Sequence, residues 1–127
     1  MMKKGSLLIT FMYSLHYPET AKICADAGIN VFSMDAIPRT TLAQRMDALS
    51  SQANLAGYKS VILAANHLRK IFPMLMTAAG TITPAKVVIM GAGVAGLSAL
   101  GTAKRLGAVV EVSDIRPQVK EEVLSLG

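Results

Sequence analysis

A chain of 127 residues in which 52% are hydrophobic is long and apolar enough to bury a core, which excludes an intrinsically disordered protein. The formal charge of +5 comes from basic residues scattered along the chain, and the absence of a clustered basic stripe argues against nucleic-acid binding. A single cysteine, Cys24, excludes an internal disulfide. The sequence has only two histidines, which are far apart, so we predict no metal site.

The first forty residues predict a strand, a helix and a second strand. Residues 6–13, SLLITFMY, are typical of a buried strand, and Pro18 lies where the first turn of a helix favours proline. Gly28 ends that helix, and residues 30–37, NVFSMDAI, predict the second strand. Such strands pair in parallel through a right-handed crossover. We therefore expect residues 1–40 to form the C-terminal part of a first α/β domain.

Two segments imitate membrane signals. At the N-terminus, lysines followed by an apolar run resemble the start of a signal peptide, but no small-residue cleavage site follows, so a buried strand is the better interpretation. The uncharged segment between Lys86 and Lys104 is slightly short for a membrane span and contains four glycines. A strand, a turn and a helix explain it better, so we expect no transmembrane helix in this sequence.

Residues 41–83 predict a connecting helix and loop. Apolar residues recur at helical spacing over residues 41–70 without a proline, so we expect one long helix, interrupted at most near Gly57. One of the two threonines at its start would cap it. Residues 72–84, FPMLMTAAGTITP, are bracketed by prolines and broken by a glycine, which predicts a loop.

Residues 84–127 predict the first, incomplete half of a dinucleotide-binding domain. A strand over residues 86–90 runs into three glycines at the GxGxxG spacing, and a helix to about Leu106 follows. In order, the glycines would serve a tight turn, the approach of a pyrophosphate to the backbone, and close packing of the helix. The alternative is a glycine-rich structural turn without a ligand. The candidate phosphate-facing residues are Gly91, Ala92, Gly93, Val94, Ala95 and Gly96.

An acidic residue ends the next strand, AVVEVSD, where such sites bind the adenine ribose. Asp114 lies eighteen residues after Gly96, and its carboxylate would accept hydrogen bonds from the ribose hydroxyls and repel a 2′-phosphate. This favours NAD(H) as the cofactor. Ile115 and Arg116 complete the candidate cofactor-binding residues, and Arg116 leaves NADP as the alternative because an arginine can accommodate the extra phosphate. RPQVKEEVLSL then predicts a further helix.

A polar segment precedes the glycine turn. Residues 37–58, IPRTTLAQRMDALSSQANLAGY, carry many polar side chains, which a helix cap and a solvated face would also explain. Together with FPMLMTAAGTITPAKVVIMGAGVAGL and AKRLGAVVEVSDIRPQVKEEVLSLG, this segment resembles the NAD(H)-binding alpha component of proton-translocating NAD(P) transhydrogenases, in the alanine dehydrogenase and pyridine nucleotide transhydrogenase family. The resemblance extends over residues 6–127.

This resemblance implies a fold, an activity and partners. The fold has two Rossmann-like α/β domains, so the sequence would hold the end of the first, a long joining helix and the first half of the second. NAD(H) binds to this component and NADP(H) to a partner component. Hydride passes directly between the two nicotinamides, coupled to proton translocation through a membrane component. A homodimer of the complete subunit and a peripheral location at the cytoplasmic face of the inner membrane are also implied.

The resemblance places the family's polar loop at the nicotinamide. Hydride transfer needs no general base, so the implied role of this loop is positioning and electrostatics. Asp47, paired with Arg39, would orient the carboxamide and stabilise positive charge on the donor ring, and Gln44 would hydrogen-bond to the same group. The residues carried over in this way are Arg39, Gln44, Asp47 and Ser50.

Two alternative functions remain open. Alanine dehydrogenases share the fold and a similar glycine turn, but RTTLAQRMDALSSQ is the transhydrogenase form of the polar loop, and the substrate-binding arginine and lysine of those enzymes have no place here. The second alternative is a non-catalytic nucleotide-binding or assembly fragment, because we expect the sequence to be an inactive piece of a longer subunit. A mean hydropathy of +0.44 fits apolar surfaces that further strands would cover.

Overall fold

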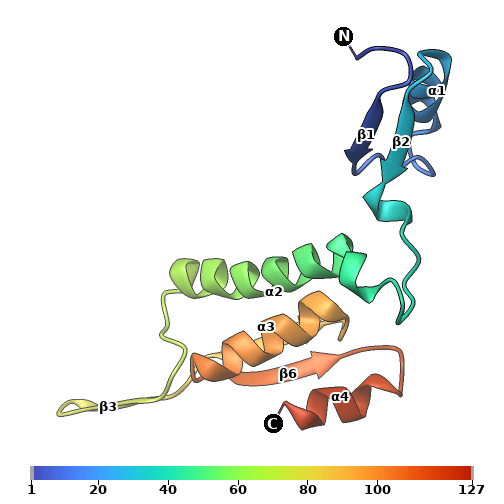
Figure 1. Cartoon of the computed structure of the whole chain (residues 1–127). Coiled ribbons are helices and arrows are strands. Elements are labelled where there is room, and N and C mark those ends of the chain that lie inside the picture. The colour runs from blue at the N-terminus through green and yellow to red at the C-terminus, as the bar shows by residue number, and fades with distance from the viewer. Residues whose placement is uncertain (1, 127) are drawn as a thin grey trace. The chain divides into compact units, whose positions relative to one another are not determined.

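The computed structural model describes residues 2–126 and has the predicted α/β architecture, with strands paired in parallel (Figure 1). The chain folds as two compact units, Met1–Ser51 and Gln52–Gly127. Both units contain a parallel strand pair, and the second also contains an antiparallel hairpin. Among the described residues, no helix has the length and apolar character needed to cross a membrane.

The first unit is built on the parallel strands β1 (Leu7–Thr10) and β2 (Asn30–Ser33), which α1 (Pro18–Asp26) connects. Pro18 is the first residue of α1, where its missing N–H leaves no helical hydrogen bond unmade. Gly28 has a φ of +65°, a left-handed conformation that favours glycine, and turns the chain toward β2. The predicted order of strand, helix and strand is confirmed.

Both strands of the first unit are shorter than predicted because the chain turns at their carboxyl ends. Tyr13 has a φ of +51°, and the 3₁₀ helix η1 (Met34–Ala36) follows β2 directly. The Asp35 carboxylate holds this turn, since one of its oxygens accepts hydrogen bonds from the N–H groups of Met12 and Tyr13 at 2.9 and 3.1 Å. The Ser33 hydroxyl donates to the same oxygen. These bonds take the place of further strand pairing.

The long helix α2 (Ala48–His67) begins later than predicted and is continuous. The residues expected to form its first turns instead form a loop and the 3₁₀ helix η2 (Gln44–Met46). Thr40 caps the turn before η2 rather than α2. No interruption occurs at Gly57, where the absence of a side chain serves packing: a Cβ there would lie 2.9 Å from the carbonyl carbon of Ala95.

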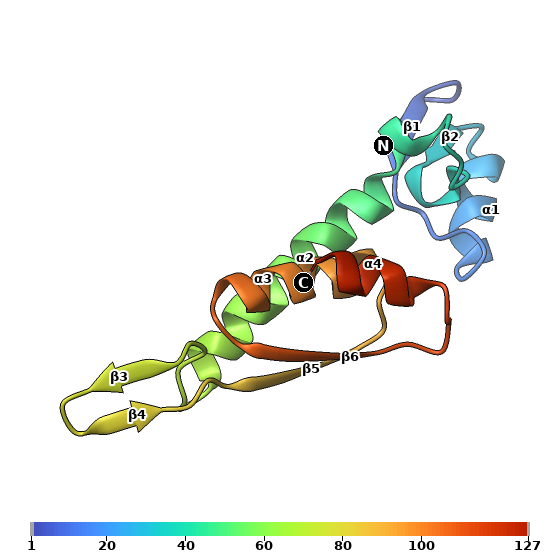
Figure 2. The same ribbon diagram turned by 90° about the horizontal axis from the view of Figure 1, so that it is seen from below.

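The predicted loop over residues 72–84 contains a β-hairpin, in which β3 (Leu75–Thr77) pairs antiparallel with β4 (Gly80–Ile82). The Thr77 hydroxyl donates a hydrogen bond to the Gly80 carbonyl at 2.9 Å, and Gly80 closes the turn with a φ of +129°. All residues of both strands are exposed, so no buried face produces an alternating pattern in the sequence. The hairpin projects from the rest of the second unit (Figure 2).

The second unit is built on the parallel strands β5 (Lys86–Met90) and β6 (Val109–Ser113), in register from Lys86 opposite Val109 to Met90 opposite Ser113. The helix α3 (Val94–Arg105) connects the two strands and packs on both (Figure 2), and α4 (Val119–Ser125) follows β6. The four elements predicted for this part of the sequence are confirmed.

One face of this strand pair carries the core, and the other face is open. The core residues are small or aliphatic apart from one phenylalanine, as the low aromatic content of 5% requires. On the open face, Val88, Met90 and Val109 are 56%, 90% and 51% exposed. The buried core consists of Val61, Phe72, Ala85, Ala99 and Ala103, against which Val87, Ile89 and Val110 pack.

Candidate dinucleotide-binding site

The glycine turn joins the carboxyl end of β5 to the N-terminus of α3. Gly91 has a φ of +100°, which favours glycine, and its N–H donates to the Ser113 carbonyl at 2.7 Å. Gly93 occupies the cap position, and α3 begins at Val94. The first N–H groups of a helix have no partner inside the helix, so the turn presents backbone donors suited to an anion.

The fold itself requires two of the three glycines. Gly91 is required by its backbone conformation, and Gly96 is required by packing, because a Cβ there would collide with the Gly91 carbonyl, 2.9 Å from its carbon. Gly93 differs from both. Its φ of −80° suits any residue, and a Cβ would meet no atom of the described chain within 4 Å. Nothing in residues 2–126 therefore explains a glycine at position 93.

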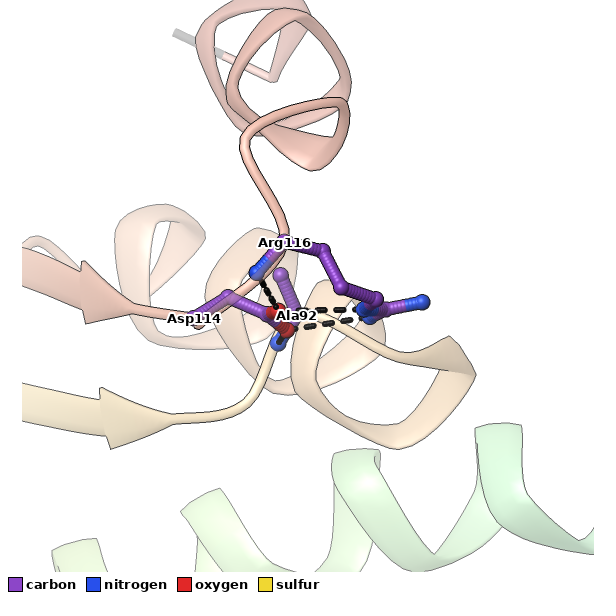
Figure 3. A network of polar contacts seen from close by, with 3 residues as sticks. All are labelled: Ala92, Asp114 and Arg116. Carbon is purple, nitrogen blue, oxygen red and sulfur yellow. Dashed lines mark hydrogen bonds and ion pairs between the residues drawn. The ribbon is translucent and has the colours of Figure 1, made fainter.

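Asp114 follows β6 directly and closes the glycine turn from the neighbouring strand (Figure 3). Its Oδ2 accepts a hydrogen bond from the Ala92 N–H at 2.7 Å, and its Oδ1 accepts one from the Arg116 N–H at 2.8 Å. The Arg116 guanidinium donates from Nε to Oδ1 at 3.0 Å and from Nη2 to Oδ2 at 2.9 Å. This bidentate ion pair and the Ala92 hydrogen bond join three predicted cofactor-binding residues in one network.

The charge on Asp114 is strongly stabilised. The hydrogen bonds from the Arg116 side chain, followed by those from the Ala92 and Arg116 N–H groups, hold the pKa of the Asp114 carboxyl far below its usual value of 3.8. The same carboxylate raises the pKa of Arg116. Only 8% of the Asp114 side chain is exposed, compared with 55% of the Arg116 side chain. Asp114 is therefore an ionised acceptor at neutral pH, and Arg116 covers it on the solvent side.

A pocket of about 360 Å³ opens beside Asp114, next to α4. Lys120 lines this pocket but is not among the predicted residues; its position four residues after Arg116 was the available signal. Ile115, predicted together with Asp114, is 99% exposed and does not line this pocket. The lining residues are Val112, Asp114, Arg116, Pro117, Val119, Lys120 and Val123.

The polar loop belongs to the first unit, and the structure brings only two of its candidate residues together. Asp47 directly precedes α2, and its two carboxylate oxygens accept hydrogen bonds from the Ser50 N–H at 2.8 Å and the Ser50 hydroxyl at 2.6 Å. Asp47 therefore caps α2. These bonds lower the pKa of Asp47, the Ser50 hydroxyl most strongly, and the Arg39 charge adds a smaller effect.

The other two loop residues, Arg39 and Gln44, are exposed. The predicted pairing of Arg39 with Asp47 is not formed as an ion pair among residues 2–126, where Ser50 instead occupies both Asp47 oxygens. Arg39 acts on Asp47 through its charge alone. A ligand could therefore contact the Arg39 and Gln44 side chains without first breaking an ion pair between Arg39 and Asp47.

The parallel strands, the glycine turn and the acid at the end of β6 define a Rossmann-like α/β protein, and comparisons with known proteins identify the family. Residues 60–127 match the model described as "Alanine dehydrogenase/PNT, C-terminal domain". Residues 1–56 match the corresponding N-terminal domain. The chain belongs to the alanine dehydrogenase/PNT family, which confirms the resemblance found in the sequence.

Within this family the chain is similar to transhydrogenase subunits over nearly its whole length. It is 50% identical over 126 residues to NAD(P) transhydrogenase subunit alpha of Haemophilus influenzae, covering 99% of this chain and 25% of that protein. The crystal structure of transhydrogenase from Sinorhizobium meliloti matches with a TM-score of 0.96 and 53% identity, over 98% of this chain and 36% of that chain. An L-alanine dehydrogenase structure matches with a TM-score of 0.80 and 27% identity, over 98% of this chain and 35% of that chain. The chain thus spans between a quarter and about a third of the length of these relatives.

Proposed function

We propose that the chain is the NAD(H)-binding part of a proton-translocating NAD(P) transhydrogenase, an oxidoreductase. In the complete protein, hydride passes between NAD(H) on this component and NADP(H) on a partner component, and a membrane component couples the transfer to proton translocation. The nicotinamides supply the hydride chemistry, and residues of this chain bind and orient one of them. The higher identity to a transhydrogenase structure, 53% compared with 27% for an alanine dehydrogenase, supports this choice.

The observation that best supports nucleotide binding is the glycine at position 93, which the fold does not require. The fold explains a glycine at positions 91 and 96 but leaves position 93 open to any residue. A pyrophosphate that approaches the N-terminus of α3 requires a bare backbone at the second glycine, which supplies the missing reason. Next to this turn, the ionised Asp114 is an acceptor suited to ribose hydroxyls, beside a pocket of about 360 Å³.

The carboxylate of Asp114 favours NAD(H) over NADP(H), because it repels a 2′-phosphate. Arg116 reduces this discrimination, since its guanidinium neutralises the carboxylate and could itself contact the phosphate. NADPH is therefore the nucleotide against which NADH binding has to be compared.

The family resemblance supports a role for the polar loop at the nicotinamide. The side chains of Arg39 and Gln44 are exposed, and the resemblance assigns them to contacts with the carboxamide. Asp47 is held ionised by its hydrogen bonds with Ser50. A carboxylate fixed in this way would stabilise the positive charge that develops on the donor ring as hydride leaves.

The proposed partners of the complete subunit are an NADP-binding component, a membrane component and a second copy of itself, at the cytoplasmic face of the inner membrane. The β3–β4 hairpin supports an interface between copies. Its residues Leu75, Met76 and Ile82 are 45%, 77% and 42% exposed, and Met74, directly before β3, is 60% exposed. Apolar side chains grouped on an exposed hairpin favour a protein partner.

Titration of NADH into the wild-type chain and into the Gly93→Ala variant tests nucleotide binding. We expect the substitution to weaken NADH binding at least about tenfold, or ~1.4 kcal/mol, because the new methyl group blocks the pyrophosphate. The melting temperature should change by less than about 2 °C, since the methyl group meets no protein atom. A Gly93→Ala variant that binds NADH as tightly as the wild type, or a wild type that binds no NADH, would contradict the proposal.

Gly96→Ala is the matched control. Its methyl group would collide with the Gly91 carbonyl, so we expect the free energy of unfolding to fall by about 1–3 kcal/mol. The two alanine variants thus separate a glycine required by the ligand from one required by the fold. In the complete protein, reduction of NADP⁺ by NADH distinguishes a transhydrogenase from an alanine dehydrogenase, which would instead consume pyruvate and ammonia.

A further inference from the structure

The Asp114 carboxylate has no acceptor position left for a ligand. Oδ1 accepts two hydrogen bonds, from the N–H and the Nε–H of Arg116, and Oδ2 accepts two, from the Ala92 N–H and the Nη2–H of Arg116 (Figure 3). Each carboxylate oxygen offers about two lone-pair positions, so all four are occupied. A ribose that donates to Asp114 must therefore displace a donor already in place.

The four donors are not equally difficult to displace. The Ala92 N–H links the glycine turn to Asp114 at the end of β6, and the Arg116 N–H belongs to the segment that directly follows Asp114, so the removal of either would require the backbone to move. The Arg116 guanidinium lies at the end of a side chain that is 55% exposed, where water can solvate it after it leaves. Hydrogen bonds from water to the freed guanidinium would offset part of the cost of breaking this pair. The guanidinium is therefore the donor that a ligand would replace.

We propose that Arg116 is a latch on the nucleotide site: its guanidinium occupies Asp114 until the 2′- and 3′-hydroxyls of a ribose displace it and donate to the same two oxygens. This inference rests on the proposed function, because it assumes that a nucleotide ribose binds at Asp114. Arg116 is then a positioning residue that keeps the carboxylate ionised and oriented toward the turn before the nucleotide arrives. Ribose binding must break the two hydrogen bonds from the Arg116 guanidinium to Asp114, and this cost lowers the affinity for the nucleotide.

Adenosine tests the latch without interference from the charge of the diphosphate. It carries the ribose diol but no phosphate, and 2′,3′-dideoxyadenosine lacks the diol. We expect Arg116→Met, which removes both side-chain donors, to bind adenosine about fivefold more tightly than the wild type, with no change for 2′,3′-dideoxyadenosine. Arg116→Lys keeps the charge but loses the bidentate geometry, so it should also bind adenosine more tightly than the wild type.

Lys120→Met is the matched control, because it removes one positive charge from the same pocket and leaves the hydrogen bonds of Asp114 intact. Lys120→Met should therefore not bind adenosine more tightly than the wild type, because all four hydrogen bonds to Asp114 remain in place. An Arg116→Met variant that binds adenosine no more tightly than the wild type would overturn the latch. If NADH binds to the wild type while both Arg116 variants show no gain, the latch alone is wrong; if neither NADH nor adenosine binds to any variant, the proposed nucleotide site is also wrong.

A second measurement avoids substitutions that could perturb folding. In the wild-type chain, the Nε–H of Arg116 should give a hydrogen-bonded NMR signal, because it donates to Oδ1 at 3.0 Å. Adenosine should remove or strongly shift this signal, and 2′,3′-dideoxyadenosine should leave it unchanged. A signal that persists at saturating adenosine would show that the guanidinium stays on Asp114, and the latch would be rejected.

Discussion

Asp114 illustrates how two neighbouring residues set the charge of a site. The Arg116 side chain and the N–H groups of Ala92 and Arg116 favour the ionised carboxylate and depress its pKa. A carboxyl group whose pKa is lower in the folded than in the unfolded chain stabilises the fold above the unfolded pKa, here 3.8. That contribution is lost as the pH falls through the depressed native pKa. The link between the glycine turn and β6 should therefore weaken only in strong acid.

This dependence can be measured from the carboxyl ¹³C shift of Asp114 as the pH is lowered. In the wild-type chain we expect ionisation to persist well below pH 3.8, and in Arg116→Met we expect the pKa to rise toward that value because the largest cause of the shift is gone. Lys120→Met should leave the titration as in the wild type. A wild-type midpoint near 3.8 would show that the ion pair does not form in solution.

Asp47 combines a structural and a proposed functional role, and substitution can separate them. Asparagine caps a helix about as well as aspartate, so Asp47→Asn should preserve α2 while removing the charge. If the complete protein has the proposed transhydrogenase activity, we expect Asp47→Asn and Gln44→Asn to slow hydride transfer from NADH to NADP⁺ while NADH affinity stays within about tenfold, or ~1.4 kcal/mol. Stopped-flow absorbance and NADH titration give the two quantities, and unchanged turnover in both variants would remove the loop from the proposed function.

At the scale of elements, the sequence predicted best where the signal was local. The strand, the glycine spacing and the helix after it follow from backbone rules that act over a few residues, and β5, the turn and α3 are confirmed. The start of α2 was predicted too early because a threonine followed by Gln44 resembles a helix cap, whereas Asp47 is the residue that caps α2. The closure of Arg116 on Asp114 depends on a side-chain rotamer, which no sequence pattern specifies.

The β3–β4 hairpin was missed because its stability does not come from burial in this chain. Every strand residue is exposed, and the pairing rests on backbone hydrogen bonds and the turn at Gly80. An alternating apolar pattern arises only when one face is covered. The sequence therefore showed apolar residues between prolines and gave no indication of their pairing.

Substitution can test the proposed interface between copies of the chain at the β3–β4 hairpin. Met76 is 77% exposed, and Met76→Lys would place a charge in any interface that the hairpin forms. We expect the substitution to raise the dissociation constant of a dimer at least about tenfold, measured by analytical ultracentrifugation over a range of concentrations. Met90→Lys, on the open face of the second unit, is the control and should have a smaller effect. Association that responds to Met90→Lys and not to Met76→Lys would reject the hairpin as the interface.

For the whole molecule, the open face of the β5–β6 pair is an exposed apolar surface separate from the hairpin. Val88, Met90 and Val109 lie on it with at least half of each side chain accessible. The chain spans only part of its relatives, and in a two-sided α/β sheet such a face is normally covered by helices. This surface also supports the alternative of an assembly fragment, which associates through apolar contacts.

Dye binding measures that surface directly. We expect the folded chain to enhance the fluorescence of anilinonaphthalene sulfonate, and Val88→Lys with Met90→Lys to reduce the enhancement about twofold, because lysine removes the apolar contact area. Unchanged circular dichroism would show that the double variant is folded. Equal dye binding by the wild type and the double variant would place the accessible apolar surface elsewhere.

The cap that Asp47 forms on α2 also affects what the residue at this position says about the function of distantly related sequences. An aspartate, asparagine or serine at this position benefits any chain that keeps the helix, including one that has lost hydride transfer. Its retention in a new sequence is therefore poor evidence of enzymatic competence. Gly93 carries the opposite information, because no feature of the folded chain protects it from drift. Among related sequences, a side chain at that position would indicate a nucleotide site that selection has abandoned.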